Sequence, residues 1–154
     1  MYKRHKTAVS TVFVLTAVLC YSTKILYDNI ADIAITVVSI SVAVYIATMS
    51  ALLGSPYADK LKSIRDTEIK EKSQLGVLTT YLRVAGNCGI LTILVSSLYK
   101  IPSIANVSPQ LQRLTSSISC AIFVINIFFL WLVFKFLATA LMNSASNNSS
   151  VRSG

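Results

Sequence analysis

The chain has 154 residues, of which 54% are hydrophobic and only 13% are charged. Its mean hydropathy of +0.65 is too high for a soluble domain of this size, which needs a more charged surface. A net charge of +8 would suggest nucleic acid in a soluble protein. Here the basic residues gather in short segments between apolar stretches, so membrane topology explains them and we expect no direct DNA binding.

Four apolar stretches are long enough to cross a bilayer: residues 7–26, 33–53, 75–98 and 114–141. They predict an all-α integral membrane protein, a bundle of four transmembrane helices within a single domain, residues 1–142. A polar loop, residues 54–74, separates the second and third spans. The low-complexity tail, residues 143–154, is predicted to be disordered. The first span could be a signal peptide, but no small-x-small cleavage site follows it, which favours a retained anchor.

Basic residues are distributed unevenly between the ends of these spans. The start of the chain, the loop 54–74 and the tail hold nine Lys or Arg, whereas the two other connections hold three. By the positive-inside rule this favours a topology with both termini and the loop 54–74 on the cytoplasmic side. Trp131 and Lys135 then lie towards the inner end of the fourth span, where an indole and a snorkelling ammonium are favourable. Ser108 and Pro109 are a typical helix start before that span.

Small residues recur every fourth position along the second span: Ser39, Ala43, Ala47 and Ala51. Such a stripe lets a second helix approach closely, which promotes packing in a membrane where helices gain no hydrophobic effect from each other. The partner can be another helix of the same bundle or a helix of a second copy. The stripe alone leaves both possibilities open.

The third span carries an arginine at a depth where charge is costly. Arg83 lies eight residues beyond Leu75, about 12 Å along a helix, with Thr79 one turn before it and Asn87 one turn after it. A charge at the centre of a bilayer costs about 2.5–3.5 kcal/mol on insertion scales. The sequence offers Arg83 no carboxylate at its own depth. We therefore expect it to snorkel, to bind carbonyl groups or to face a water-filled inner vestibule shared between subunits.

Asn126 lies near the middle of the fourth span, at the predicted depth of Asn87. Two asparagines on adjacent antiparallel helices can share a hydrogen bond of about 1 kcal/mol. The sequence therefore predicts an Asn87–Asn126 contact, which is either a structural clamp between the helices or part of a polar path for water or ions. With Arg83 and Thr79, these residues form the candidate pore or vestibule.

The loop 54–74 carries the densest charge in the chain. Its basic residues are Lys60, Lys62, Arg65, Lys70 and Lys72. Most of this segment, residues 57–74, is predicted to be helical and either to project from the third span or to continue into it. It is either a solvated loop at the lipid surface or a contact surface for a cytoplasmic protein or an anionic ligand such as a nucleotide.

No enzyme chemistry is indicated by the residue types. The single histidine, His5, lies in the basic start, and no acid occupies a central membrane position. No HExxH motif, Ser/Lys dyad or phosphate-binding glycine loop is present. The three cysteines, Cys20, Cys88 and Cys120, lie within apolar stretches without metal-ligand spacing, and we interpret them as packing residues. We expect no cofactor and no metal.

Three consecutive segments resemble a group of small bacterial four-span membrane proteins of phage defence. They are ATMSALLGSP (47–56), ADKLKSIRD (58–66) and LGVLTTYLR (75–83). The group includes the phage-exclusion protein RexB and the membrane subunits of two-gene systems such as Hailong and Kiwa. The resemblance covers the middle third of the chain and is one of hydropathy and loop pattern, so no site residue is transferred. It implies a bacterial inner-membrane effector or sensor, gated by a cytoplasmic partner or its nucleotide product, that permeabilises or depolarises the membrane during infection.

These observations together predict a homo-oligomeric, channel-like effector, taken as a tetramer, that disrupts the membrane potential. One alternative is a non-conducting anchor or sensor that recruits a soluble partner through residues 57–74. Another is a holin-like lysis protein.

Overall fold

The computed structural model describes residues 2–66, 69, 71–100 and 108–151. All described elements are helical: α1 (Lys3–Thr23), the 3₁₀ turn η1 (Tyr27–Ile30), α2 (Ala31–Leu53), α3 (Pro56–Ser63), α4 (Gln74–Leu98) and α5 (Pro109–Val151). Within the described residues, four helical segments are long and apolar enough to span a membrane: α1, Tyr27–Leu53, α4 and Pro109–Thr139. The prediction of an all-α bundle with four transmembrane helices is confirmed.

Helix α1 begins and ends earlier than the predicted span 7–26. Lys24 adopts a left-handed conformation, with φ 55°, and its backbone N–H bonds to the carbonyl of Cys20. This αL cap satisfies a carbonyl of the last turn and stops the helix. The chain then passes through η1, in which Tyr27 is fully buried, and enters α2 at Ala31 instead of residue 33.

Helix α3 covers only part of the predicted helical segment 57–74. After Ser63 the chain turns back on itself, and Arg65 and Ser73 form an isolated antiparallel bridge. The N–H of Asp66 donates to the carbonyl of Lys72 at 2.9 Å, and the N–H of Gln74 donates to the carbonyl of Ile64 at 3.0 Å. Ser73 then caps α4, because its hydroxyl accepts from the N–H of Gly76 at 3.2 Å. The expectation of a helix over the whole segment was wrong, because the turn and the cap satisfy its backbone groups instead.

Helix α5 starts at Pro109, as the Ser-Pro pair predicted, and continues past residue 142 to Val151. The expected disordered tail is therefore helical over residues 143–151. Extending an existing helix adds one hydrogen bond per residue without a new nucleation cost, so even the Ser- and Asn-rich end can follow the apolar span.

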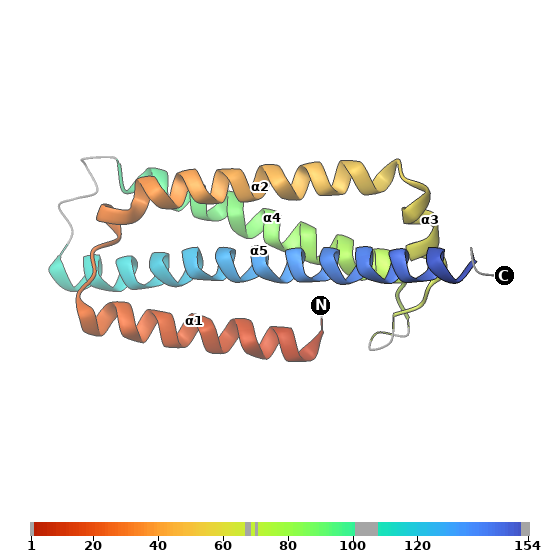
Figure 1. Cartoon of the computed structure of the whole chain (residues 1–154). Coiled ribbons are helices and arrows are strands. Elements are labelled where there is room, and N and C mark those ends of the chain that lie inside the picture. The colour runs from red at the N-terminus through yellow and green to blue at the C-terminus, as the bar shows by residue number, and fades with distance from the viewer. Residues whose placement is uncertain (1, 67–68, 70, 101–107, 152–154) are drawn as a thin grey trace.

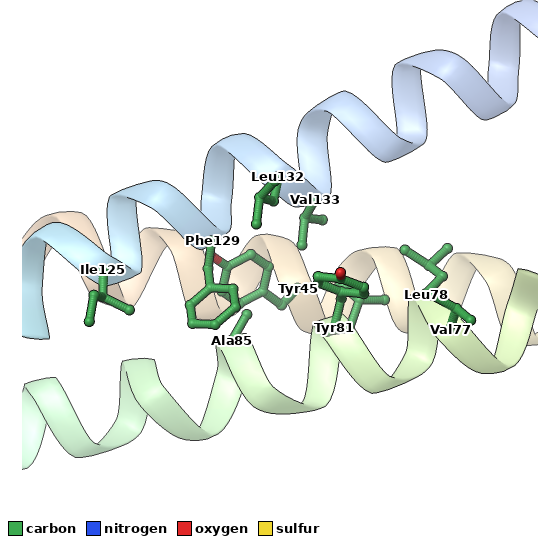
Figure 2. Packing of buried hydrophobic residues seen from close by; sticks show 10 residues of the cluster. Tyr45, Val77, Leu78, Tyr81, Ala85, Ile125, Phe129, Leu132 and Val133 are labelled. Atoms are coloured by element: carbon green, nitrogen blue, oxygen red, sulfur yellow. The ribbon is translucent and has the colours of Figure 1, made fainter. Parts of the chain in front are cut away.

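The long helices form two pairs that meet along α4 and α5. Helix α1 packs mainly on α5, on the side of α5 away from α2, and α2 packs on α4 (Figure 1). The core lies between α2, α4 and α5, where Tyr45, Tyr81, Ala85, Phe129 and their neighbours interdigitate (Figure 2). Helix α1 contains no buried residue, so most of its apolar surface faces outward.

Candidate functional site

Asn126 is a polar residue buried between the helices of the bundle. Its side chain is 1% exposed, and its amide nitrogen Nδ2 donates to Thr92 Oγ1 at 2.5 Å and to the carbonyl of Ile122 at 3.0 Å. A weaker contact joins it to the carbonyl of Cys88 at 3.5 Å. Asn126 therefore ties α5 to α4 as a buried hydrogen-bonded clamp.

The predicted bond between Asn87 and Asn126 was wrong. Successive helical residues are rotated by about 100°, so Asn87 lies about 200° around the axis from Ala85 and from Gly89. Ala85 and Gly89 are both fully or almost fully buried, whereas Asn87 is exposed. The depth of the two asparagines does not decide whether they meet, because the rotation of α4 turns Asn87 away from α5.

Arg83 and Asn87 both lie on the outer surface of α4. They are one helical turn apart, so they share a face of the helix. Among the described residues neither side chain has a hydrogen-bond or ion-pair partner. Thr79, one turn earlier, is half-buried, and its hydroxyl donates to the carbonyl of Leu75 at 2.8 Å. The four predicted vestibule residues therefore do not converge within one copy, since Asn126 points into the bundle and Arg83 and Asn87 point out of it.

The small-residue stripe of α2 also faces outward. Ser39, Ala43, Ala47 and Ala51 are all exposed, and a different line of residues is buried: Ala31, Ala34, Val38, Ser41 and Tyr45. Packing of the stripe inside the bundle was one of the two interpretations left open by the sequence. The structure excludes it, and the stripe remains available for contact with another chain.

Close packing of α2 against α4 occurs instead at Gly89. A Cβ added to Gly89 would lie 2.5 Å from Val42 Cγ2 and 3.3 Å from Val38 Cγ1. Both contact atoms belong to β-branched side chains with restricted rotamers in a helix. Gly89 is therefore the position that lets the two helices approach.

Three of the five predicted basic loop residues lie around one open cavity. Lys62, Arg65 and Lys72 line a space of about 520 Å³, together with Ser63, Glu71 and Ser73. The turn that pairs Arg65 with Ser73 brings these side chains together. Lys70 lies outside the described residues. For Lys60 the structure describes the backbone, which is part of α3, but not the side chain. The cavity has an excess of positive charge among its described residues, which suits an anionic ligand or partner.

A polar network at the start of α1 was missed by the sequence analysis. The Tyr81 hydroxyl lies 2.6 Å from His5 Nδ1 and accepts from the backbone N–H of Tyr2 at 3.1 Å. The Tyr2 hydroxyl donates to Asp66 Oδ2 at 2.5 Å, and Asp66 Oδ1 accepts from the N–H of Ile69 at 2.8 Å. The bonds of Tyr81 with Tyr2 and His5, and the bond of Tyr2 with Asp66, join residues more than 60 positions apart in the chain, so no local sequence pattern predicts the network. It joins α1, α4 and the loop after α3 at one end of the bundle.

Comparison with protein-family models, curated proteins and solved structures found no match to this chain. The resemblance to phage-defence membrane proteins stays a prediction.

Proposed function

We propose that this protein is an oligomeric, channel-like membrane protein in which the α4 face with Arg83 and Asn87 lines a path for anions. The observation that carries the proposal is the position of Arg83. It lies on the outer surface of a helix of transmembrane length and apolarity, and no described residue neutralises it.

The cost of exposing the Arg83 charge to lipid favours an assembly in which another copy of the chain covers the α4 face. A charged side chain inside a bilayer costs about 2.5–3.5 kcal/mol at the centre and is normally solvated by protein or by a water-filled cavity. Polar groups lie near the depth of Arg83 in the interior of the bundle. Tyr81, two residues before Arg83, is buried there and bonds to His5. Placing Arg83 in a water-filled vestibule between copies removes the penalty, and a ring of guanidinium groups favours anions over cations.

The exposed small-residue stripe of α2 supports self-association. Ser39, Ala43, Ala47 and Ala51 offer a surface on which another helix can pack closely without any lipid between them. In the proposed assembly this stripe contributes to the contact between copies, while Arg83 and Asn87 face the path.

The basic cavity around Lys62, Arg65 and Lys72 is proposed as the place where a signal is received. An anionic ligand, such as a nucleotide, or the acidic surface of a cytoplasmic protein would be attracted there. With the resemblance described above, this favours a gated effector of phage defence in a bacterial inner membrane, with both termini on the cytoplasmic side.

The test is anion flux through vesicles that contain the purified protein. We expect it to dissipate a chloride gradient, and Arg83→Ala to slow chloride flux roughly tenfold, the factor that corresponds to about 1.4 kcal/mol at a barrier. Arg83→Lys keeps the charge and should retain most of the flux. Arg113→Gln is the matched control, because Arg113 is an exposed arginine at the other end of the bundle. Flux that is unchanged in Arg83→Ala would contradict the proposal.

A non-conducting anchor is the second candidate, and the basic cavity favours it because ligand or partner binding there needs no path through the membrane. In that case the wild-type protein leaves the chloride gradient intact in every condition, with or without its cytoplasmic partner.

A further inference from the structure

A second cavity lies between the start of α1, the first turns of α4 and the middle of α5, and the proposed function does not use it. Its volume is about 550 Å³, within the range of sites that hold small molecules. Its floor is part of the core drawn in Figure 2, because Leu78, Tyr81, Leu132 and Val133 belong to that core and also line the cavity. Aromatic side chains of α5 form another part of its lining: Phe128, Trp131 and Phe136.

The charged groups around this cavity are mainly cationic. Arg4 and Lys135 line it, and neither has a carboxylate partner among the described residues. Lys135 Nζ lies 5.2 Å from the centre of the Trp131 ring, which holds the ammonium at the aromatic lining. Among the described residues one carboxylate lines the cavity, that of Asp66, and it already accepts bonds from the Tyr2 hydroxyl and from the N–H of Ile69. The cavity therefore offers positive charge to an incoming anion.

The cavity lies near one end of the membrane-spanning part of α5, at the expected level of the membrane surface. Trp131, Lys135 and Thr139 belong to the last turns of the membrane-spanning part of α5, Pro109–Thr139. Indole and basic side chains at the end of a span are typical of the headgroup level of a bilayer. A ligand that fits this level would place a polar head beside Arg4 and Lys135 and an apolar part against the aromatic side chains of α5.

We propose that this cavity binds the headgroup of an anionic phospholipid. The phosphodiester would lie beside Arg4 and Lys135, and the upper part of an acyl chain would cover Phe128, Trp131 and Phe136. Basic pockets between transmembrane helices recognise anionic headgroups in this way. A free phosphate ion would satisfy the cations but would leave the apolar lining uncovered, which is the reason to choose a lipid. This inference does not depend on the proposed channel function.

The single tryptophan of the chain, Trp131, makes the proposal directly measurable. The protein is placed in vesicles of phosphatidylcholine and phosphatidylglycerol, with brominated acyl chains on one lipid at a time. Bromine quenches an indole that it touches, so the ratio of quenching at equal mole fraction gives the relative affinity of the two lipids for the site. We expect phosphatidylglycerol to be preferred roughly fivefold or more, the factor expected for one or two basic residues near a headgroup.

Matched variants separate the cavity from general surface charge. The pair Arg4→Gln and Lys135→Gln should bring the preference close to one. The pair Lys24→Gln and Arg113→Gln removes the same net charge at the other end of the bundle and should leave the preference unchanged. Each variant is referenced to its own quenching by brominated phosphatidylcholine, which also reports whether Trp131 still faces lipid.

Three outcomes would overturn the proposal. The first is equal quenching of the wild-type protein by both lipids. The second is an equal loss of preference in the two pairs of variants. The third is displacement of phosphatidylglycerol by inorganic phosphate at constant ionic strength, which would identify a site for a soluble anion instead.

Discussion

At the residue scale, the buried amide of Asn126 has one strong partner on the neighbouring helix. The bond from Nδ2 to Thr92 Oγ1 is 2.5 Å long and lies entirely within the bundle. Hydrogen bonds between membrane helices contribute about 0.6 kcal/mol on average and up to about 1.7 kcal/mol. Because both partners of this bond are about 1% exposed, it belongs in the upper part of that range.

A double-mutant cycle on Asn126→Ala and Thr92→Val measures this bond. We expect each variant to lower the free energy of unfolding in detergent, with a coupling energy of about 1–1.7 kcal/mol. Thr36→Val is the control, because Thr36 is exposed on α2 and bonds only within its own helix. A coupling energy near zero would mean that the clamp does not stabilise the bundle.

Lys100 forms an exposed ion pair at the end of α4. Its Nζ lies 2.8 Å from Asp32 Oδ2. The hydrogen bond to Asp32 is the main cause that raises the pKa of Lys100 above its ordinary value. The folded protein therefore binds this proton more tightly than the unfolded chain. The small stabilisation is complete below the ordinary lysine pKa and is lost as the pH rises through the raised pKa.

We predict that Asp32→Asn lowers the pKa of Lys100 towards its ordinary value. The measurement is an NMR titration of the dimethylated lysines at alkaline pH, in the wild type and in the variant. A Lys100 signal that titrates at the same pH in both proteins would show that the pair does not persist in solution.

At the element scale, two glycines of α4, Gly86 and Gly89, lie three residues apart. The close approach of α2 to α4 depends on only one of them. A Cβ on Gly89 would clash with Val42, whereas a Cβ on Gly86 would meet no atom within 4 Å. The sequence shows two similar glycines. Only the packing distinguishes the one that is needed.

We therefore predict opposite effects for two identical substitutions. Gly89→Ala should destabilise the bundle by about 1–3 kcal/mol, the usual cost of overpacking. Gly86→Ala should be neutral or stabilising by up to about 1 kcal/mol, because alanine is the better helix former. Unfolding in a detergent titration measures both, and equal effects would contradict the close approach at Gly89.

At the scale of the whole molecule, the small-residue stripe of α2 and the α4 face with Arg83 and Asn87 both point outward. Together they predict that copies of the chain associate. A cysteine at position 87, in a cysteine-free background, should form disulfide-linked dimers in membranes under mild oxidation. Leu19→Cys is the control, because Leu19 is 63% exposed on α1, away from both the α2 stripe and the α4 face with Arg83 and Asn87. Equal cross-linking at the two positions, or none at position 87, would argue against a path that copies of the chain share at the Arg83–Asn87 face.

The sequence by itself determined the fold class of this protein. Length and apolar composition are enough to define four transmembrane helices, because every backbone polar group in a bilayer must be satisfied within its own helix. The third span matched α4 to within one residue, and Pro109 marked the start of α5. The C-terminal ends of α1 and α5 differed from the predicted ends. Hydropathy does not reveal that Lys24 is left-handed and ends α1, or that α5 extends into a polar tail.

Only the tertiary structure decided which face of each helix is buried. The spans are apolar on nearly all sides, so the sequence gives weak information about rotation about the helix axis. That rotation turned Asn87 and the stripe of α2 outward, paired Asn126 with Thr92, and brought Tyr2, His5, Tyr81 and Asp66 together. Arg83 kept the feature found in the sequence, a charge within a membrane span, and the structure added that it lies on the outside of the bundle.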